Sequence, residues 1–291
     1  MNIFVSGSNG FIASHLIEVL REQGHKVTGL ERHTGNTLEG MERPKPDIEY
    51  LGDLRDKEIV YKAISKCDAV INLAGILGTQ ETVNNPYPSV EVNILGALNV
   101  LEACREYKLP MVQIAVGNHW MNNSYSITKT TAERFTLMYV EEHGVQANIV
   151  RALNAFGERQ AWHPVRKMMP FFITQALQDK DIEVYGDGSQ VMDFVYVKDV
   201  ARVLLKALEN AKNGDVGNIY EAGSGLSVTV KDWAQKVIDY SGSKSQIKHL
   251  PMRPGETPGS VVLSENPYPI EYQDLDDKLQ QTIDWYRKCT K

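Results

Sequence analysis

The feature that most constrains the fold is a glycine-rich turn at residues 7–13, between an apolar run and an amphipathic pattern. Residues 3–5 form a strand-like apolar run, and from residue 11 apolar side chains recur at helical spacing. A glycine-rich turn between a strand and a helix lets the backbone approach a pyrophosphate, and the helix N-terminus offers unpaired N–H groups. The spacing is GxxGxxA rather than GxGxxG, so a plain structural turn remains an alternative.

Further strand-like runs follow at residues 26–30, 68–73 and 110–116, and residues 92–107 have a helical pattern. Strands that alternate with helices favour a parallel sheet with helices on both faces. We therefore predict an α/β fold, with a Rossmann-type doubly wound parallel sheet and a smaller C-terminal α/β substrate domain.

The predicted division into domains rests on a change of pattern near residue 155, where prolines and glycines begin to punctuate shorter elements. The first domain is assigned residues 1–158, and residues 190–210 are expected to return to it. Residues 159–291 are assigned to a smaller domain that shapes a substrate pocket.

Composition narrows the classes of partner. The formal net charge is -6 and no lysine- or arginine-rich run is present, so we expect no nucleic-acid partner. The three cysteines lie far apart without a CxxC pair, which favours reduced thiols and predicts no bound metal. No signal peptide and no apolar run of about 20 residues is visible, so we expect a cytoplasmic protein without a membrane partner.

Glu31 ends the second predicted strand, 24 residues after Gly7. A carboxylate about 20 residues beyond the glycine-rich turn accepts hydrogen bonds from the adenosine ribose of a dinucleotide and repels a 2′-phosphate. Glu31 therefore favours NAD over NADP. Arg32 and His33 follow it directly and could contact a phosphate instead, and a solvated glutamate at the end of a strand is the structural alternative.

Tyr125 and Lys129 lie four residues apart in a predicted helix, so both side chains are expected on one face. A phenol has a pKa near 10, and an ammonium within ~4–6 Å can lower it by about 1–3 units. Such a pair can transfer protons near neutral pH. A YxxxK string also occurs by chance, so its context decides.

That context resembles the extended short-chain dehydrogenase/reductase family, of the NAD-dependent nucleotide-sugar epimerase/dehydratase type, over almost the full chain. The matching stretches, in order, are residues 7–12, 52–56, 72–75, 93–101, Tyr125 with Lys129, 151–157, 185–190, 193–200 and 253–256. The resemblance implies an NAD-dependent epimerase or ketoreductase of a nucleotide-diphosphate sugar. Hydride would move at a sugar carbon, with Tyr125 as the acid/base.

The resemblance also implies roles for single residues. Lys129 would hold the nicotinamide ribose. The residues expected to bind the cofactor are Gly7, Asn9, Gly10, Phe11, Ile12, Glu31, Arg32, Asp53, Leu54, Leu73, Ala74, Gly75, Asn93, Tyr125 and Lys129. Asn154, Gln190 and Arg253 would contact the substrate.

The chain departs from the family's pattern just before the tyrosine. Val116 stands where the family carries a serine or threonine that hydrogen-bonds the reacting sugar oxygen. We expect Asn118 or His119 to take over this catalytic contact. Gly117 and Asn118 occupy the place of the dehydratases' Asp-Glu pair, which disfavours the dehydratase alternative. A catalytically weakened NAD-binding sensor or partner protein is the other alternative.

Members of the family often form homodimers through two helices, here expected at residues 92–107 and 125–140. The apolar residues available for such a contact are Ala97, Leu98, Leu101, Phe135, Leu137, Met138 and Tyr139. The alternative is that all of them face the sheet of their own subunit.

Overall fold

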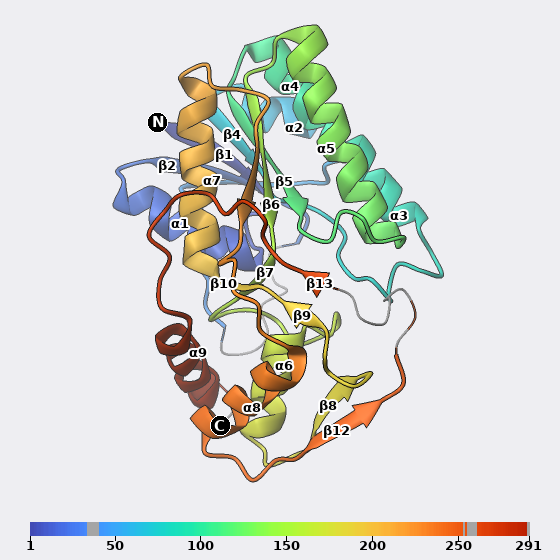
Figure 1. The fold of residues 1–291 in the computed structure, drawn as a ribbon. Helices are drawn as coiled ribbons and strands as arrows, with labels where there is room; N and C mark the ends of the chain where they lie inside the picture. The colour runs from blue at the N-terminus through green and yellow to red at the C-terminus, as the bar shows by residue number, and fades with distance from the viewer. Residues whose placement is uncertain (34–40, 253, 255–260, 290–291) are drawn as a thin grey trace.

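A computed structural model of the chain describes residues 1–33, 41–252, 254 and 261–289. Its centre is a parallel sheet with the strand order β11-β6-β5-β4-β1-β2-β3 (Figure 1). The strands are β1 (Asn2–Ser6), β2 (Lys26–Glu31), β3 (Ile48–Leu51), β4 (Ala69–Asn72), β5 (Met111–Val116), β6 (Ala147–Ala152) and β11 (Ile219–Ala222). The chain runs outward from β1 in both directions, so the predicted doubly wound parallel sheet is confirmed.

Helices cover both faces of this sheet (Figure 1). One face carries α1 (Phe11–Glu22) and α7 (Val197–Lys212), and the other carries α2 (Lys57–Ile64), α4 (Ala97–Tyr107) and α5 (Ser124–His143). Ile3 and Val5 pack toward α1 and α7, whereas Phe4 packs into the core of the other face. Burial on both faces explains why the central strands consist of almost continuous apolar runs.

The helix predicted at residues 92–107 lies within a longer helical segment that has three parts. It begins as a short α-helix, α3 (Tyr87–Ser89), continues as a π-helix, η1 (Val90–Gly96), and becomes α-helical in α4. Single π-helical turns inside longer helices are common at functional sites. Here the wider turn carries the buried Asn93.

The part of the chain after β6, apart from α7 and β11, forms the C-terminal part of the molecule and has its own apolar core. Its helices and strands are α6 (Met168–Ala176), α8 (Val230–Ser241), α9 (Leu275–Cys289), β7 (Asn154–Phe156) paired with β10 (Phe194–Tyr196), β8 (Ile182–Tyr185) paired with β12 (Ile247–Leu250), and β9 (Val191–Met192) paired with β13 (Val261–Val262). Aromatic rings contribute to this core. The ring centroids of Phe194 and Trp233 lie 5.1 Å apart, and the rings meet edge to face. Such edge contacts are favourable for aromatic pairs.

The chain that returns to the central sheet extends beyond the predicted residues 190–210. α7 lies on the sheet through residue 212, and β11 pairs with β6 in parallel. This last strand is a four-residue Ile-Tyr-Glu-Ala segment, too short to stand out as a strand in the sequence. The boundary at residue 158 stays a prediction.

No helix among the described residues is both long enough and apolar enough to cross a membrane.

Candidate functional site

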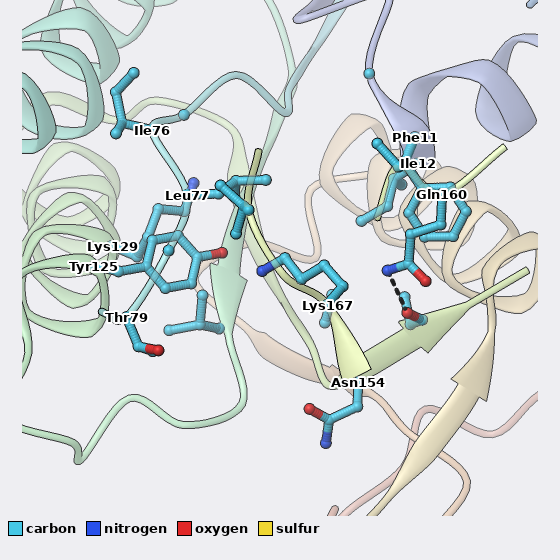
Figure 2. Close-up of a pocket in the computed structure, with 18 of the residues that line it drawn as sticks. Phe11, Ile12, Ile76, Leu77, Thr79, Tyr125, Lys129, Asn154, Gln160 and Lys167 are labelled. Carbon is cyan, nitrogen blue, oxygen red and sulfur yellow. Dashed lines mark hydrogen bonds between the residues drawn. The ribbon is translucent and has the colours of Figure 1, made fainter. Parts of the chain in front are cut away.

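A cavity of about 920 Å³ opens at the carboxyl ends of the central strands. Its lining combines the turn after β1, the loop after β4, the end of β5, the start of α5 and residues of the C-terminal part. Figure 2 shows a part of this lining in close-up, with labelled residues from α1, the loop after β4, α5 and the C-terminal part. β1 and β4 are neighbours at the point where the strand order reverses. In open α/β sheets, ligands bind at this reversal point.

The glycine-rich turn passes directly against the end of β4. Gly7 has φ +64°, and a Cβ added there would lie 3.1 Å from the Cα of Ala74. Gly10 precedes α1, and a Cβ on it would lie 2.9 Å from the carbonyl oxygen of Gly7. Only glycine allows both the left-handed conformation and this close approach. The turn is therefore a close-packed loop at the cavity edge.

Buried hydrogen bonds hold the strand ends beneath this turn. The Ser6 hydroxyl donates to Asn72 Oδ1 at 2.5 Å and accepts from the backbone N–H groups of Leu73 and Ala74 at 3.0 Å each. The Asn72 amide then donates to Gln113 Oε1 at 2.8 Å. This network joins β1, β4 and β5. Sequence analysis missed it, although three polar residues inside apolar strands were its visible signal.

The start of α1 fits an anionic ligand. This helix has no side-chain cap on its N-terminus and no acidic residue in its first turn. Its unpaired N–H groups and the positive end of its dipole therefore remain available to a pyrophosphate. Gly7, Gly10, Phe11 and Ile12 line the cavity here, as expected for cofactor-binding residues. Asn9 does not line the cavity; its backbone N–H donates to Glu31 and its carbonyl oxygen accepts from Arg43.

Glu31 and Asp53 lie at the predicted adenosine end of the cavity, with Arg32 and Leu54 beside them. The Glu31 carboxylate accepts from the backbone N–H of Asn9 at 3.1 Å and of Arg32 at 2.8 Å. Hydrogen bonds from Arg55 hold Asp53 and keep the pKa of its carboxyl below the usual value. Both carboxylates are therefore held in orientation by hydrogen bonds.

Arg43 is a cavity residue that sequence analysis did not identify. Its guanidinium donates to the carbonyl oxygen of Asn9 in the glycine-rich turn, and to that of Arg159 at 2.9 Å. Burial, followed by the nearby Arg159, lowers its pKa, while Glu31 raises it. Arg43 thus brings a cation to the phosphate loop from a segment whose sequence carries no motif.

A second charge cluster joins α1 to the C-terminal part. Arg159 donates to Glu18 Oε1 at 2.6 Å and to His15 Nδ1 at 2.8 Å. Burial, followed by the charge of Arg159, lowers the pKa of His15 to about 4, so its ring is neutral near neutral pH. His15 Nε2 lies 2.9 Å from the carbonyl oxygen of Glu158. This contact fixes the chain where it leaves the first half of the molecule.

Tyr125 and Lys129 both line the cavity from the first turns of α5 (Figure 2). Asn123 caps this helix by accepting from the Ser126 N–H at 2.9 Å. Lys129 is 3% exposed, and a Cβ added at Gly75 would lie 3.7 Å from its Nζ. The ammonium therefore lies beside the loop after β4, whose Leu73, Ala74 and Gly75 also line the cavity.

The pKa values of this pair differ from the sequence-based expectation. Burial raises the pKa of Tyr125 to about 12 and lowers that of Lys129 to about 8. Both shifts have the sign expected when a charged form is removed from water. The lysine would lose its proton before the phenol ionised, so the pair alone does not give the lowered phenol pKa that its spacing predicts.

Asn93, predicted to bind the cofactor, does not line the cavity. It is buried in η1, where its amide oxygen accepts from the Ile76 N–H at 2.7 Å. Its amide nitrogen donates to the Ile76 carbonyl at 3.1 Å and to Thr128 Oγ1 at 3.0 Å. These contacts make it a positioning residue that ties the loop after β4 to the helix of Lys129.

The end of β5 separates the two residues expected to replace the missing hydroxyl. Val116 and Asn118 line the cavity, whereas His119 does not. The chain turns tightly after β5, and the turn directs the His119 side chain away from the cavity. The His119 Nδ1 atom lies 3.2 Å from the Gly117 carbonyl oxygen. The Asn118 amide nitrogen lies 3.4 Å from Met121 Sδ.

Of the three predicted substrate residues, Asn154 and Gln190 line the cavity. Asn154 donates to the Asp193 carbonyl at 3.1 Å, and Gln190 donates to that of Tyr185 at 2.9 Å. Arg253 lies outside the described residues. Lys167 also lines the cavity and lies opposite Tyr125, a contact that sequence analysis missed (Figure 2).

Comparison with known proteins agrees with this geometry. The sequence model of the NAD dependent epimerase/dehydratase family matches residues 3–223. A UDP-N-acetyl-alpha-D-glucosaminuronate decarboxylase from Bacillus cytotoxicus is 28% identical over 98% of this chain and 97% of its own length. A putative UDP-glucose 4-epimerase from Methanocaldococcus jannaschii is 27% identical over 98% of each chain.

Solved structures have the same fold. The UDP-glucose 4-epimerase of Thermus thermophilus, in complex with NAD, has a TM-score of 0.84 at 28% identity and covers 99% of each chain. The UDP-glucose 4-epimerase of Thermotoga maritima, solved with UDP-glucose, has a TM-score of 0.89 at 24% identity over 100% of each chain. The second likeness concerns the fold alone.

The fixed Glu31 carboxylate generates a prediction about cofactor choice. NAD should bind at least about tenfold more tightly than NADP, about 1.4 kcal/mol, because the carboxylate repels a 2′-phosphate. Calorimetric titration of both cofactors into the protein measures this ratio. Glu31→Gln is the matched variant, and it should bring the affinities for NAD and NADP closer together. Equal or reversed affinities in the wild type would mean that Arg32 and Arg43 control the site instead.

Proposed function

This chain belongs to the NAD dependent epimerase/dehydratase family, and we propose that it is an NAD-dependent epimerase or ketoreductase of nucleotide sugars. The observation that carries the proposal is a single cavity with the glycine-rich turn at one end and Tyr125 with Lys129 at the other. A dinucleotide and a second ligand fit such a cavity together, with their reacting groups beside the tyrosine.

The cofactor residues in this proposal are the turn at Gly7 and Gly10, the Glu31 carboxylate and the Lys129 ammonium. NAD held by these residues would supply the hydride acceptor and, in an epimerase, the hydride donor for the other face of the sugar carbon. Tyr125 accepts the proton of the sugar hydroxyl while the C–H bond of the same carbon breaks, and the C–OH group becomes a ketone. Tyr125 gives the proton back when the hydroxyl forms again. A ketoreductase performs only the second half and needs reduced cofactor from another reaction.

Dehydration has less support in this cavity. Removal of water from a sugar needs an acid and a base near the reacting carbons. Gly117 and Asn118 follow β5, at the place where the dehydratases of the resembled family pattern carry an Asp-Glu pair. The carboxylates that line the described cavity are Glu31, Asp53, Glu81 and Glu183, and none of them belongs to the segment after β5. We therefore rank dehydration below epimerisation and reduction.

The substrate class is a sugar linked to a nucleoside diphosphate, and UDP sugars are the first to test. The epimerase and decarboxylase relatives carry UDP sugars in their names. Asn154 and Gln190 are the described residues proposed to contact the substrate, together with Arg253. The C-terminal part from residue 159 is proposed as the sugar-nucleotide domain, apart from its returning segment.

We also propose a cytoplasmic location. Cys67 and Cys104 are buried free thiols, as expected in a reducing compartment.

The acid/base role generates a mutational prediction. Tyr125→Phe should lower turnover by about 10²–10⁴-fold and leave NAD binding nearly intact, because the phenol oxygen serves mainly the proton transfer and adds at most a small part of the cofactor contact. Lys129→Ala should weaken both, since its ammonium is proposed to contact the ribose as well. Formation of product from UDP-glucose, followed by NMR, and NAD titration measure the two effects. Tyr240→Phe, outside the cavity lining, is the control.

A Tyr125→Phe enzyme with more than about a tenth of the wild-type rate would show that another group is the acid. A wild type that binds NAD without acting on any nucleotide sugar would favour the sensor alternative.

Homodimerisation through the outer helices is a further proposal. Ala97, Leu101 and Tyr139, expected at the contact, are buried within their own subunit. Met138, also expected at the contact, is 36% exposed, and Leu95 (51%) and Ile127 (51%) are further exposed apolar side chains on these helices. A symmetric pairing of this face would cover them.

We predict that light scattering at micromolar concentration gives twice the 32.7 kDa mass of one chain. Leu95→Glu should shift the mass toward one chain, because it puts a charge into an apolar contact. Leu226→Glu, equally exposed but outside these helices, should not. The mass of a single chain for the wild type would rule out the dimer.

A further inference from the structure

Val116 leaves the reacting sugar oxygen without the hydroxyl that the family's pattern predicts, and the residues after it do not supply a clear substitute. The His119 side chain is outside the cavity lining. The Asn118 amide nitrogen is directed at Met121 Sδ, 3.4 Å away. A buried hydroxyl left without a partner is costly. A donor from another element would remove that cost.

Lys167 brings such a donor from the opposite side of the cavity. It immediately precedes α6 and has an extended backbone, with φ −93° and ψ 140°. Its Nζ lies 5.9 Å from the centroid of the Tyr125 ring. In Figure 2 the ammonium end of Lys167 projects into the cavity toward the hydroxyl of Tyr125. The two groups therefore border the same space, the one in which the sugar's reacting oxygen must lie to reach Tyr125.

The neighbouring Arg166 explains why this lysine enters the cavity. Arg166 donates to Glu183 Oε2 at 2.7 Å and to the Tyr185 hydroxyl at 3.0 Å, and its guanidinium carbon stacks 3.4 Å from the centroid of Phe171. These contacts fix Arg166 against β8. The backbone that enters α6 is thereby anchored one residue before Lys167.

We propose that Lys167 is a catalytic residue that donates a hydrogen bond to the reacting oxygen of the sugar, in the role of the hydroxyl absent at position 116. An ammonium carries three donors, and its hydrogen bonds are strengthened by charge. It gains most when negative charge develops on that oxygen as the proton moves to Tyr125. No proton leaves Lys167 in this role. The inference rests on the proposed function, because it needs a sugar hydroxyl beside Tyr125.

The test compares Lys167→Met, Lys167→Arg and the double variant Val116→Thr/Lys167→Met with the wild type, all loaded with NAD. The exposed Lys180, beyond α6, gives the matched control Lys180→Met. We expect Lys167→Met to lower kcat by about 10²-fold, the typical loss for one donor at a developing oxyanion. Lys167→Arg keeps the charge and should retain more of the rate. Val116→Thr should restore much of the loss in the double variant.

A binding measurement separates this role from a contact with the diphosphate and does not need turnover. Calorimetry with UDP and with UDP-glucose gives the affinity added by the sugar. Lys167→Met should reduce that added affinity and leave UDP binding unchanged. Unchanged kcat and unchanged sugar affinity would overturn the inference, as would an equal loss for UDP and UDP-glucose, or a double variant no faster than Lys167→Met. Absence of turnover in the wild type would count against the proposed function, and the binding result would still decide on Lys167.

Discussion

The contact between the glycine-rich turn and the end of β4 is the constraint on which the site depends. A single added carbon at Gly7 would lie 3.1 Å from the Ala74 backbone. The buried Ser6 hydroxyl holds the same two strands together, with three hydrogen bonds to Asn72, Leu73 and Ala74. Because these groups are shielded from water, each lost bond would leave a buried polar atom unpaired. The turn, the β4 loop and the cavity floor thus form one rigid unit.

Burial is also the main electrostatic effect at the reacting end. It moves the pKa of Tyr125 up to about 12 and that of Lys129 down to about 8, so both groups are neutral between these values. A neutral phenol is a poor base, and oxidation of the sugar carbon needs a base that accepts the proton of its hydroxyl group. Positive charge brought close to the tyrosine favours the phenolate form. The sources of such charge in this account are the oxidised nicotinamide ring, the ammonium of Lys167 and, below a pH of about 8, the ammonium of Lys129.

Local patterns predicted the features that depend on neighbours in sequence. β1, the glycine-rich turn and α1 follow each other directly, and Tyr125 and Lys129 share one helical face, so spacing sufficed for them. Glu31 was found because its distance from Gly7 is set by one strand–helix–strand unit. Gly7, Glu31, Tyr125 and Lys129 all line the cavity.

Features that depend on tertiary contacts were not visible in the same way. β11 is a strand only because β6 offers it an edge, and Arg43 reaches the phosphate loop from a segment without periodicity. His119 lies near Val116 in sequence, yet a tight turn takes it out of the cavity, while Lys167, far away in sequence, enters it. Asn93 matched a family motif, but its buried π-helical position makes it a support for the Ile76 loop.

In its epimerase form, the central claim is that a sugar carbon is oxidised and reduced again within one cavity, while Tyr125 transfers the proton and the hydride is retained. The most direct test uses UDP-glucose that carries deuterium at C4, the carbon named for the epimerase relatives, and the NAD-loaded protein in ordinary water. NMR of the product reports both the configuration and the label at that carbon. The account predicts an inverted sugar that keeps its deuterium. An inverted sugar whose deuterium has been replaced by hydrogen from water would contradict it.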